Sequence, residues 1–454
     1  MPDFIAFGAC ASLPCSLSSM LTGTLTPLSY RNPSNTNVFY WGGKVLSLYE
    51  TGLPYAMDPR TLMTLGADDL GGALTHGTMS AHFRYDAVRD RLVVISLKPG
   101  LRKGSTLAIC EFDRGWNVLQ KQIHRIPYLN YAHDFVLCEH HYVFHITPFV
   151  KITKETVLEI ASGMSSPGEQ MKYYPDLPSR MVVIPRAMEH HTQYRSFDVD
   201  PCHIFHFGTS QEMHSDAASS ASTRSASTVS SIEFSAVCLP PRFAMFPTEY
   251  DAFLSNAATA PAKLCYFRLV FGEEKTPVHQ VQLDSSSCEF PSTHPYRHGL
   301  GGRWTWMMAN ARGQGLPFRD IVKVDEHAAK SNAQTAVAAR EAEAKLASKA
   351  ASSSSASAAV APGCATPLPA VSPTHKVWYS PGIVGEPIFI PRVASHETSQ
   401  AEEDDGWIVR QTNARLIAVC GAALASHASF APACVSLSSR SFNATSPSAT
   451  RLTL

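Results

Sequence analysis

Short runs of apolar and β-branched residues follow one another along most of the chain, and Gly, Pro, Asn and Asp separate them. The first two runs, 38–41 and 44–50, flank Gly42-Gly43, which predicts two strands joined by a tight turn. Further strand candidates are 79–86, 91–97, 106–112, 136–149, 180–185, 202–207, 232–239, 264–271 and 278–283. Long stretches with helical periodicity are rare. The pattern therefore predicts an all-β barrel, sandwich or propeller, and the length favours a propeller, although no internal repeat is visible.

Two segments, 214–231 and 326–374, interrupt this pattern. The first is small and polar and cannot build a core. The second begins with a stretch rich in Ala, Glu and Lys at 333–350, which could be a solvated helix, and continues with Ser, Ala and Pro, which predict disorder. We expect both segments to be surface insertions in loops rather than domains.

Composition narrows the class of protein. The formal net charge of the 454 residues is zero, so nothing indicates a nucleic-acid partner. The 11 cysteines include no Cys-x-x-Cys pair, so free thiols in a reducing compartment are the simplest interpretation. No apolar run reaches the roughly 18–20 residues that span a bilayer. Residues 1–30 contain no Lys or Arg and match neither a secretory signal nor a transit peptide, so plastid and cytoplasm both stay open.

Three histidines lie in or beside strand candidates. His82 is in 79–86, His133 directly precedes the run that starts at Val136, and His206 stands between two phenylalanines. In a strand, His206 points away from both neighbours, and a buried imidazole needs a partner. Neutral imidazole binds iron, copper, zinc or nickel. A hydrogen-bonded structural histidine is the alternative at each position.

Three glutamates are single carboxylates in apolar surroundings, namely Glu50, Glu289 and Glu386. Carboxylates are seldom buried without a partner, and metal-bound histidines usually donate their second ring N–H to a carboxylate. Histidines and glutamates on separate strands would fit a central metal with supporting carboxylates. The alternative is that these glutamates lie on strand surfaces.

A series of short motifs, which follow one another in a fixed order, gives more specific information about the function. They are Asn35-Thr36-Asn37-Val38, Gly42-Gly43-Lys44, Leu48 to Tyr55, Asp58-Pro59, Ser80-Ala81-His82, His133-Asp134-Phe135, Phe205-His206-Phe207-Gly208, Glu289-Phe290-Pro291, Gly385 to Phe389 and Glu403 to Trp407. Each is short, but their ordered succession, over about residues 32–409, resembles the carotenoid cleavage oxygenases.

The resemblance implies a seven-bladed β-propeller with a helical and loop dome over one face. It also implies a non-haem Fe(II) held by four histidines, of which His82, His133 and His206 match the first three. Glu50, Glu289 and Glu386 match the three glutamates that orient such histidines. Their order pairs Glu50 with His133 and Glu289 with His206, and leaves His82 without a carboxylate.

The chemistry implied by the resemblance is that of an Fe(2+) dioxygenase, which cleaves a conjugated double bond of a carotenoid or apocarotenoid to carbonyl products. The implied partners are an apolar polyene and dioxygen, together with peripheral contact to a membrane. Phe135, Phe205, Phe207 and Trp306 could line a substrate tunnel, although core packing is the ordinary role of such residues.

The resemblance fails at both ends of the chain. The family's fourth histidine lies in a His-Gly motif, which is absent after Arg410, and the fourth position would fall to water, to His427 or to another group. We expect 1–30 to be an unmatched segment, 31–410 a propeller incomplete at both ends, and 411–454 a low-complexity tail. The alternative function is a truncated, inactive homologue or an apocarotenoid-binding propeller.

Overall fold

The structure is a computed structural model. It describes residues 32–100, 104–161, 164, 170–187, 193–215, 225–241, 262–272, 278–283, 286–310, 318–332, 335, 375–379, 384–392, 403–412, 415–420 and 435–437.

The described residues form six four-stranded antiparallel sheets, and each sheet takes four strands in chain order. The first two sheets contain β1 (Asn37–Trp41), β2 (Lys44–Leu48), β3 (Tyr55–Met57) and β4 (Thr64–Ala67), then β5 (Arg84–Asp86), β6 (Arg91–Lys98), β7 (Ser105–Phe112) and β8 (Val118–Ile126). The next two contain β9 (Val136–Leu137), β10 (His141–Ile146), β11 (Arg180–Pro185) and β12 (Arg195–Asp198), then β13 (His203–His214), β14 (Val229–Leu239), β15 (Lys263–Val270) and β16 (Val278–Gln282). The last two contain β17 (Ser287–Ser292), β18 (Trp304–Asn310), β19 (Asp320–Asp325) and β20 (His375–Tyr379), then β21 (Ile388–Pro391), β22 (Gly406–Thr412), β23 (Arg415–Cys420) and β24 (Val435–Leu437).

Helices are few in this part of the chain. The α-helix α2 (Lys154–Ala161) lies in the connection between β10 and β11, and the short 3₁₀ helix η3 (Ala226–Thr228) precedes β14. Residues 326–332 are also helical and follow β19 directly. None of the described helices is long and apolar enough to cross a bilayer.

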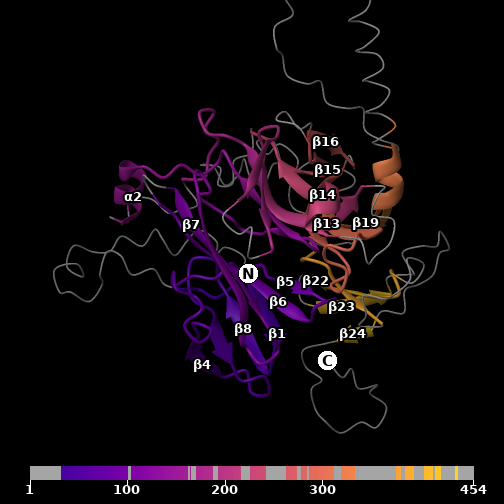
Figure 1. Ribbon diagram of the computed structural model, residues 1–454. Coiled ribbons are helices and arrows are strands. Elements are labelled where there is room, and N and C mark those ends of the chain that lie inside the picture. The colour runs from indigo at the N-terminus through magenta and orange to yellow at the C-terminus, as the bar shows by residue number, and fades with distance from the viewer. Residues whose placement is uncertain are drawn as a thin grey trace, which may run out of the picture.

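The sheets are arranged around a common centre, with the sheet of β13 to β16 beside β19 and the first two sheets on the opposite side (Figure 1). β13 contacts β9 and β17, the first strands of the two neighbouring sheets. The first strands therefore line the centre, as in a propeller. The predicted all-β propeller is confirmed, but the described residues hold six sheets, one fewer than the seven that were expected.

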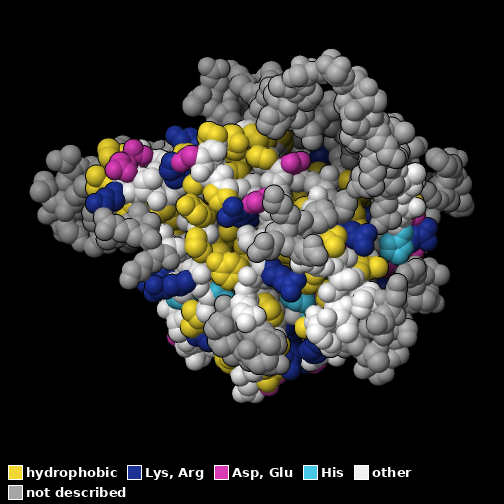
Figure 2. Space-filling view, turned by 45° about the horizontal axis from the view of Figure 1, so that its top comes forward, with side chains coloured by type: hydrophobic (Ala, Val, Ile, Leu, Met, Phe, Trp, Pro, Cys, Tyr) yellow, Lys and Arg dark blue, Asp and Glu magenta, His cyan; other side chains and the backbone are white. Residues whose placement is uncertain are grey.

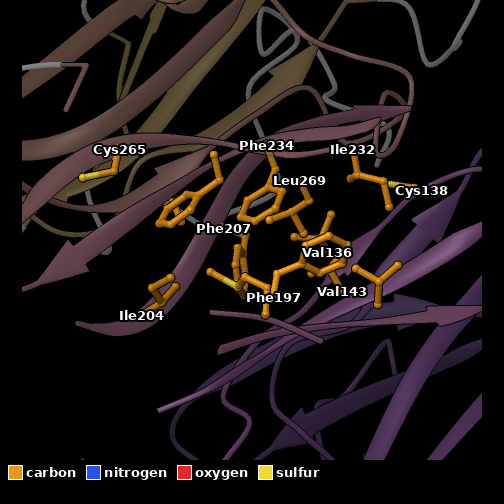
Figure 3. Packing of buried hydrophobic residues seen from close by; sticks show 14 of the residues in the cluster. Val136, Cys138, Val143, Phe197, Ile204, Phe207, Ile232, Phe234, Cys265 and Leu269 are labelled. Atoms are coloured by element: carbon orange, nitrogen blue, oxygen red, sulfur yellow. The ribbon is translucent and has the colours of Figure 1, made fainter. Parts of the chain in front are cut away.

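The hydrophobic core consists of separate layers between neighbouring sheets. One cluster joins Val143 and Val183 of the third sheet to Ile232, Phe234 and Phe267 of the fourth (Figure 3). Other clusters fill the spaces between the first and second, second and third, and fourth and fifth sheets. Both faces of most sheets are thus buried, which explains why their strands are continuous apolar runs.

Many predicted strands are confirmed, among them 91–97 as β6 and 180–185 as β11. The strand predicted over 79–86 is wrong in its first part, because only Arg84–Asp86 pairs with a neighbour. β8 was not predicted, because it buries the polar residues Gln122 and His124 and exposes the apolar Ile123 between them. Six of the described cysteines are free and buried, namely Cys110, Cys138, Cys202, Cys238, Cys265 and Cys288.

The boundaries of the two predicted insertions need correction. His214 ends β13, and Val229 and Ser231 pair with it or with its neighbour Met213, so only 215–228 lies outside the strands. The second prediction fails at its start, since 326–332 is helical and Glu326 is fully buried. Glu326 accepts hydrogen bonds from the hydroxyls of Ser235, Thr209 and Thr305, which fixes this helix to the sheets. The remainder of 326–374, apart from residue 335, lies outside the described residues.

The predicted low-complexity tail also begins too early. β22 extends to Thr412, and β23 and β24 pair beside it to complete the sixth sheet. The apolar run Leu416 to Cys420 supplies the third strand of this sheet, so 411–412 and 415–420 continue the fold. The predicted segment 1–30 lies outside the described residues.

Candidate metal centre

Six residues singled out in the sequence come from six successive sheets, and five of them lie at or just before the first strand of their sheet. Glu50 follows β2, His82 precedes β5, His133 precedes β9, His206 lies in β13, Glu289 lies in β17 and Glu386 precedes β21. Since the first strands line the centre, each sheet contributes one such side chain near the axis.

The three histidines meet at one point. Nε2 of His82 lies 2.9 Å from Nε2 of His133. The ring centroid of His206 lies 4.8 Å from the ring centroid of His82 and 5.0 Å from that of His133. One nitrogen of each ring lies within 4.8 Å of the others, so the three could hold one metal ion. His82 lies in a loop rather than in the predicted strand.

Glu50 orients His133, which is the pairing expected from the order of the motifs. Oε2 of Glu50 accepts a hydrogen bond from Nδ1 of His133, which leaves Nε2 for the centre. The hydroxyl of Tyr131 donates to the other oxygen of Glu50 at 2.8 Å. Burial opposes ionisation of Glu50, but His133 and Tyr131 outweigh it and lower the pKa of this carboxyl. Glu50 therefore stays a carboxylate and fixes the ring orientation.

Glu289 orients His206 in the same way, across two neighbouring sheets. Oε2 of Glu289 lies 2.7 Å from Nδ1 of His206. A β-bulge between Ile204 and Phe207 places an extra residue in β13, and such bulges redirect side chains. Burial opposes the charged form of His206, but Glu289 outweighs it and raises the pKa of the imidazole.

Within the described part of the chain, the ring of His82 is paired with His133 and with no carboxylate. Burial, together with the neighbouring His133 and His206, lowers the pKa of His82 well below its ordinary value. The ring is therefore neutral at neutral pH, which is the form that binds a metal.

Two polar residues, neither of which had a predicted role, hold the histidine backbones in place. Ser80 Oγ donates to the carbonyl of His133 at 2.6 Å and accepts from the backbone N–H of His82 at 3.1 Å. Asp134 accepts from Arg84 at 2.5 Å and from the backbone N–H of Phe207 at 3.0 Å. The signal for Asp134 was its place directly after His133.

Glu386 makes no recorded hydrogen bond to a histidine of this cluster among the described residues. Solvent reaches its side chain, yet protein atoms surround it, and this crowding raises the pKa of Glu386 against the attraction of His206. The histidine that Glu386 would orient by the family pattern is not part of the cluster.

The aromatic residues near the centre separate into two groups. Phe135, Phe207 and Trp306 belong to the core layers, which supports packing as their role. Phe205 also belongs to a core layer, but its ring in addition lies edge-on to His133 with centroids 5.2 Å apart. Phe290, which was not among the predicted lining residues, lies 4.8 Å from the ring of His206. Both give the centre an apolar wall.

Residues 16–416 match the family model described as retinal pigment epithelial membrane protein, RPE65. The chain belongs to this family, which is that of the carotenoid cleavage oxygenases. The match starts at residue 16, within the segment 1–30 that was predicted to be unmatched, and it ends in β23.

The similar members of the family act on more than one kind of molecule, judged by their names. The apocarotenoid-15,15'-oxygenase of Synechocystis is 26% identical over 398 residues, which are 85% of this chain and 66% of that protein. Resveratrol cleavage oxygenase 1 of Aspergillus fumigatus is 32% identical over 158 residues, 34% of this chain and 30% of that protein. The chain thus spans about two thirds of the length of the Synechocystis relative.

Among solved structures, cobalt-substituted Synechocystis ACO superimposes with a TM-score of 0.67 at 24% identity. The superposition covers 89% of this chain and 72% of the Synechocystis protein. This likeness supports the propeller fold.

The three histidines fit a divalent first-row metal. Their nitrogens converge in a crowded site, and carboxylates on His133 and His206 leave Nε2 of both rings directed inward. Within the described residues no fourth imidazole or carboxylate joins this group. His427, one of the groups considered for the fourth position, lies outside the described residues.

Proposed function

We propose that this chain is a non-haem Fe(II) dioxygenase that cleaves a conjugated carbon–carbon double bond of an apolar carotenoid or apocarotenoid to two carbonyl products. The observation that carries the proposal is the meeting of His82, His133 and His206 at one point, with Glu50 and Glu289 bound to the far sides of two of the rings. The seven-bladed propeller expected of the family belongs to the same proposal.

The protein groups have separate tasks in this chemistry. His82, His133 and His206 would hold the iron as neutral imidazoles, which bind divalent iron. Glu50 and Glu289 keep two of these rings in the tautomer with the proton on Nδ1. When bound, ferrous iron supplies the binding and activation of dioxygen. Ser80 and Asp134 keep the loops that carry the ligands in register.

The walls of the centre support an apolar, conjugated substrate. Phe205 and Phe290 lie against His133 and His206, and an aromatic wall excludes water and packs against a flat polyene. The Synechocystis relative, named for an apocarotenoid, matches most of this chain, whereas the resveratrol oxygenase matches about a third. This difference in coverage favours the longer polyene over a stilbene.

An apolar substrate also needs a route from the membrane. Three apolar side chains are exposed in and near α2, namely Val157, Leu158 and Met164. Leu158 is 65% exposed and Met164 is 71% exposed. In Figure 1 this helix stands apart from the sheets, and Figure 2 shows hydrophobic side chains among charged ones at the same left end of the molecule. We propose that this helix rests on a membrane surface.

Turnover by the purified chain tests the proposal. The chain is reconstituted anaerobically with Fe(II), exposed to oxygen with an apocarotenal or with resveratrol, and the carbonyl products are separated by chromatography. We expect two carbonyl products from the apocarotenal, and their loss in His133→Ala but not in the control His76→Ala.

Two other outcomes would overturn the proposal in different ways. Cleavage of resveratrol alone would show that the substrate class is wrong. An iron-loaded chain that binds the apocarotenal without turnover would identify a binding propeller, the alternative function.

A further inference from the structure

A second cluster of histidine and glutamate side chains lies away from the centre, where the turn between β9 and β10 meets the end of β13. One ligand atom from each of Glu139, His140 and His214 lies within 4.8 Å of the others. His214 follows His206 by eight residues along β13, which is about 26 Å at the usual rise of a strand. The cluster is therefore separate from the central histidines.

The turn that carries Glu139 and His140 is fixed by the backbone. The N–H of Cys138 donates to the carbonyl of His141 at 2.8 Å, which places Glu139 and His140 at the tip of a tight hairpin. The guanidinium of Arg186 donates to the carbonyls of Cys138 and Glu139 at 3.0 and 3.2 Å. The two side chains therefore start from a rigid position.

The packing below the turn brings it against the fourth sheet. Cys138 lies in the same core cluster as Ile232, and Figure 3 shows the two side by side. Ile232 pairs with Glu212 of β13. Glu212 and His214 are two residues apart in the same strand, so their side chains share a face.

Glu212 orients His140 as Glu50 and Glu289 orient the central ligands. Its carboxylate accepts hydrogen bonds from Nδ1 of His140 at 2.8 Å, Nδ1 of His141 at 2.9 Å and the backbone N–H of His140 at 3.0 Å. With its proton on Nδ1, His140 presents the lone pair of Nε2. A buried carboxylate behind an imidazole is the usual support of a metal-binding histidine.

The other contacts in the cluster are compatible with metal binding. The rings of His140 and His214 lie edge to face with centroids 5.9 Å apart. The carboxylate of Glu139 lies 3.9 Å from the guanidinium of Arg89, which has a closer partner in Asp86 at 3.1 Å. Two imidazoles and one carboxylate form a ligand set that zinc uses with a water as fourth ligand.

We propose that Glu139, His140 and His214 bind one divalent ion of the zinc class, which fastens the β9–β10 turn to the end of β13. Zinc ligands at about 2.0 Å from the ion lie about 3.3 Å from one another in a tetrahedron. Binding therefore draws the three side chains slightly together. The ion would add a link between two neighbouring sheets that are already joined by the hydrogen bonds of Glu212, by the bond from Ser210 Oγ to the carbonyl of Leu137 and by core packing.

Zinc binding by the metal-free full chain tests this. Equilibrium dialysis against Zn²⁺, followed by metal analysis, is carried out on the unaltered chain, on His140→Ala, on His214→Ala and on the control His76→Ala. We expect the first two variants to bind one zinc fewer per chain than the unaltered protein and His76→Ala to match it. Glu212→Gln should bind the same ion about 10–100-fold more weakly.

A second readout separates binding from folding. Zinc should raise the thermal midpoint of the unaltered chain, since a ligand of the folded state stabilises it, and this rise should shrink in Glu139→Gln. Circular dichroism of each variant without metal shows whether it folds. The same zinc stoichiometry and affinity in folded His214→Ala and Glu139→Gln as in the unaltered chain would overturn the proposal.

Discussion

The Nδ1 atom of His206 lies 2.7 Å from Oε2 of Glu289, although the two residues belong to different sheets. Because β13 packs against β17, this hydrogen bond orients the ring of His206 so that its Nε2 points to the centre. Glu50 makes the same kind of hydrogen bond to His133, and these two residues belong to two other sheets.

Replacement of Glu289 by glutamine should weaken iron binding about 10–100-fold while the fold is kept, because the negative charge behind His206 is lost and the shape is preserved. Binding is measured by anaerobic titration with Fe(II). Glu159→Gln, in α2, is the control and should bind as the unaltered chain does. Equal affinity of Glu289→Gln and the control would contradict the assigned role.

Asp134→Ala should cost about 3–5 kcal/mol of unfolding free energy, because Arg84, whose side chain is only 13% exposed, would lose its ion pair with a buried carboxylate. The matched control is Asp198→Ala, which breaks an exposed pair with Arg180 and should cost about 0–1 kcal/mol. Urea unfolding of both variants measures the difference. Equal losses would show that Asp134 does not clamp the loop that carries His133.

Stability should fall in acid through the buried carboxylate of Glu111. Burial opposes its ionisation, but Arg186, Tyr142 and Arg91 outweigh burial and lower its pKa from 4.5. The unfolded chain then binds the proton more readily, so this contribution is complete above about pH 4.5 and is lost as the pH falls through the lower, folded pKa.

Thermal midpoints between pH 7 and pH 3 test this dependence. Glu111→Gln should be less stable at pH 7 and should show a flatter decline in acid than the unaltered chain. Asp198→Asn, at an exposed pair, should leave the slope unchanged. An equally steep decline in Glu111→Gln would rule out this carboxylate as a source of the acid sensitivity.

Gly299 should tolerate alanine much less than Gly43 does. Both have positive φ, +78° and +81°, so both lose about 1–2 kcal/mol from backbone strain. A Cβ at Gly299 would also meet Cys138 Cα and Leu137 O at 2.8 Å, whereas a Cβ at Gly43 would meet nothing within 4 Å. Gly299→Ala should therefore lose about 1–3 kcal/mol more. Similar urea midpoints for the two variants would argue against the close packing of Gly299 on the β9–β10 turn.

The propeller could be predicted because its strands are buried between sheets and appear in the sequence as apolar runs. β6 and β11 were found in this way, and β8 was not, since it buries the polar Gln122 and His124 and exposes the apolar Ile123. Glu326 illustrates a different limit. It stands at the start of a segment of low complexity, and its burial depends on hydroxyls from β13, β14 and β18 that are distant in the sequence.

The three histidines of the candidate site were predicted from the order of motifs. The residues that hold these histidines in position were only partly predicted. The pairing of Glu50 with His133 and Glu289 with His206 followed from the family pattern, and the hydrogen bonds agree with it. The roles of Ser80 and Tyr131 could not be read from sequence, because each depends on a loop from another sheet. The second cluster was missed, since Glu139 and His214 are far apart in the chain and match no short metal-binding motif.

Iron content per chain tests the central claim most directly. The chain with His140→Ala, which removes the second cluster, is reconstituted anaerobically with Fe(II), separated from free iron by gel filtration and analysed for metal. We expect about one iron per chain, and almost none when His133→Ala is added. Equal iron content in the two chains would contradict the assignment of His82, His133 and His206 as the iron ligands.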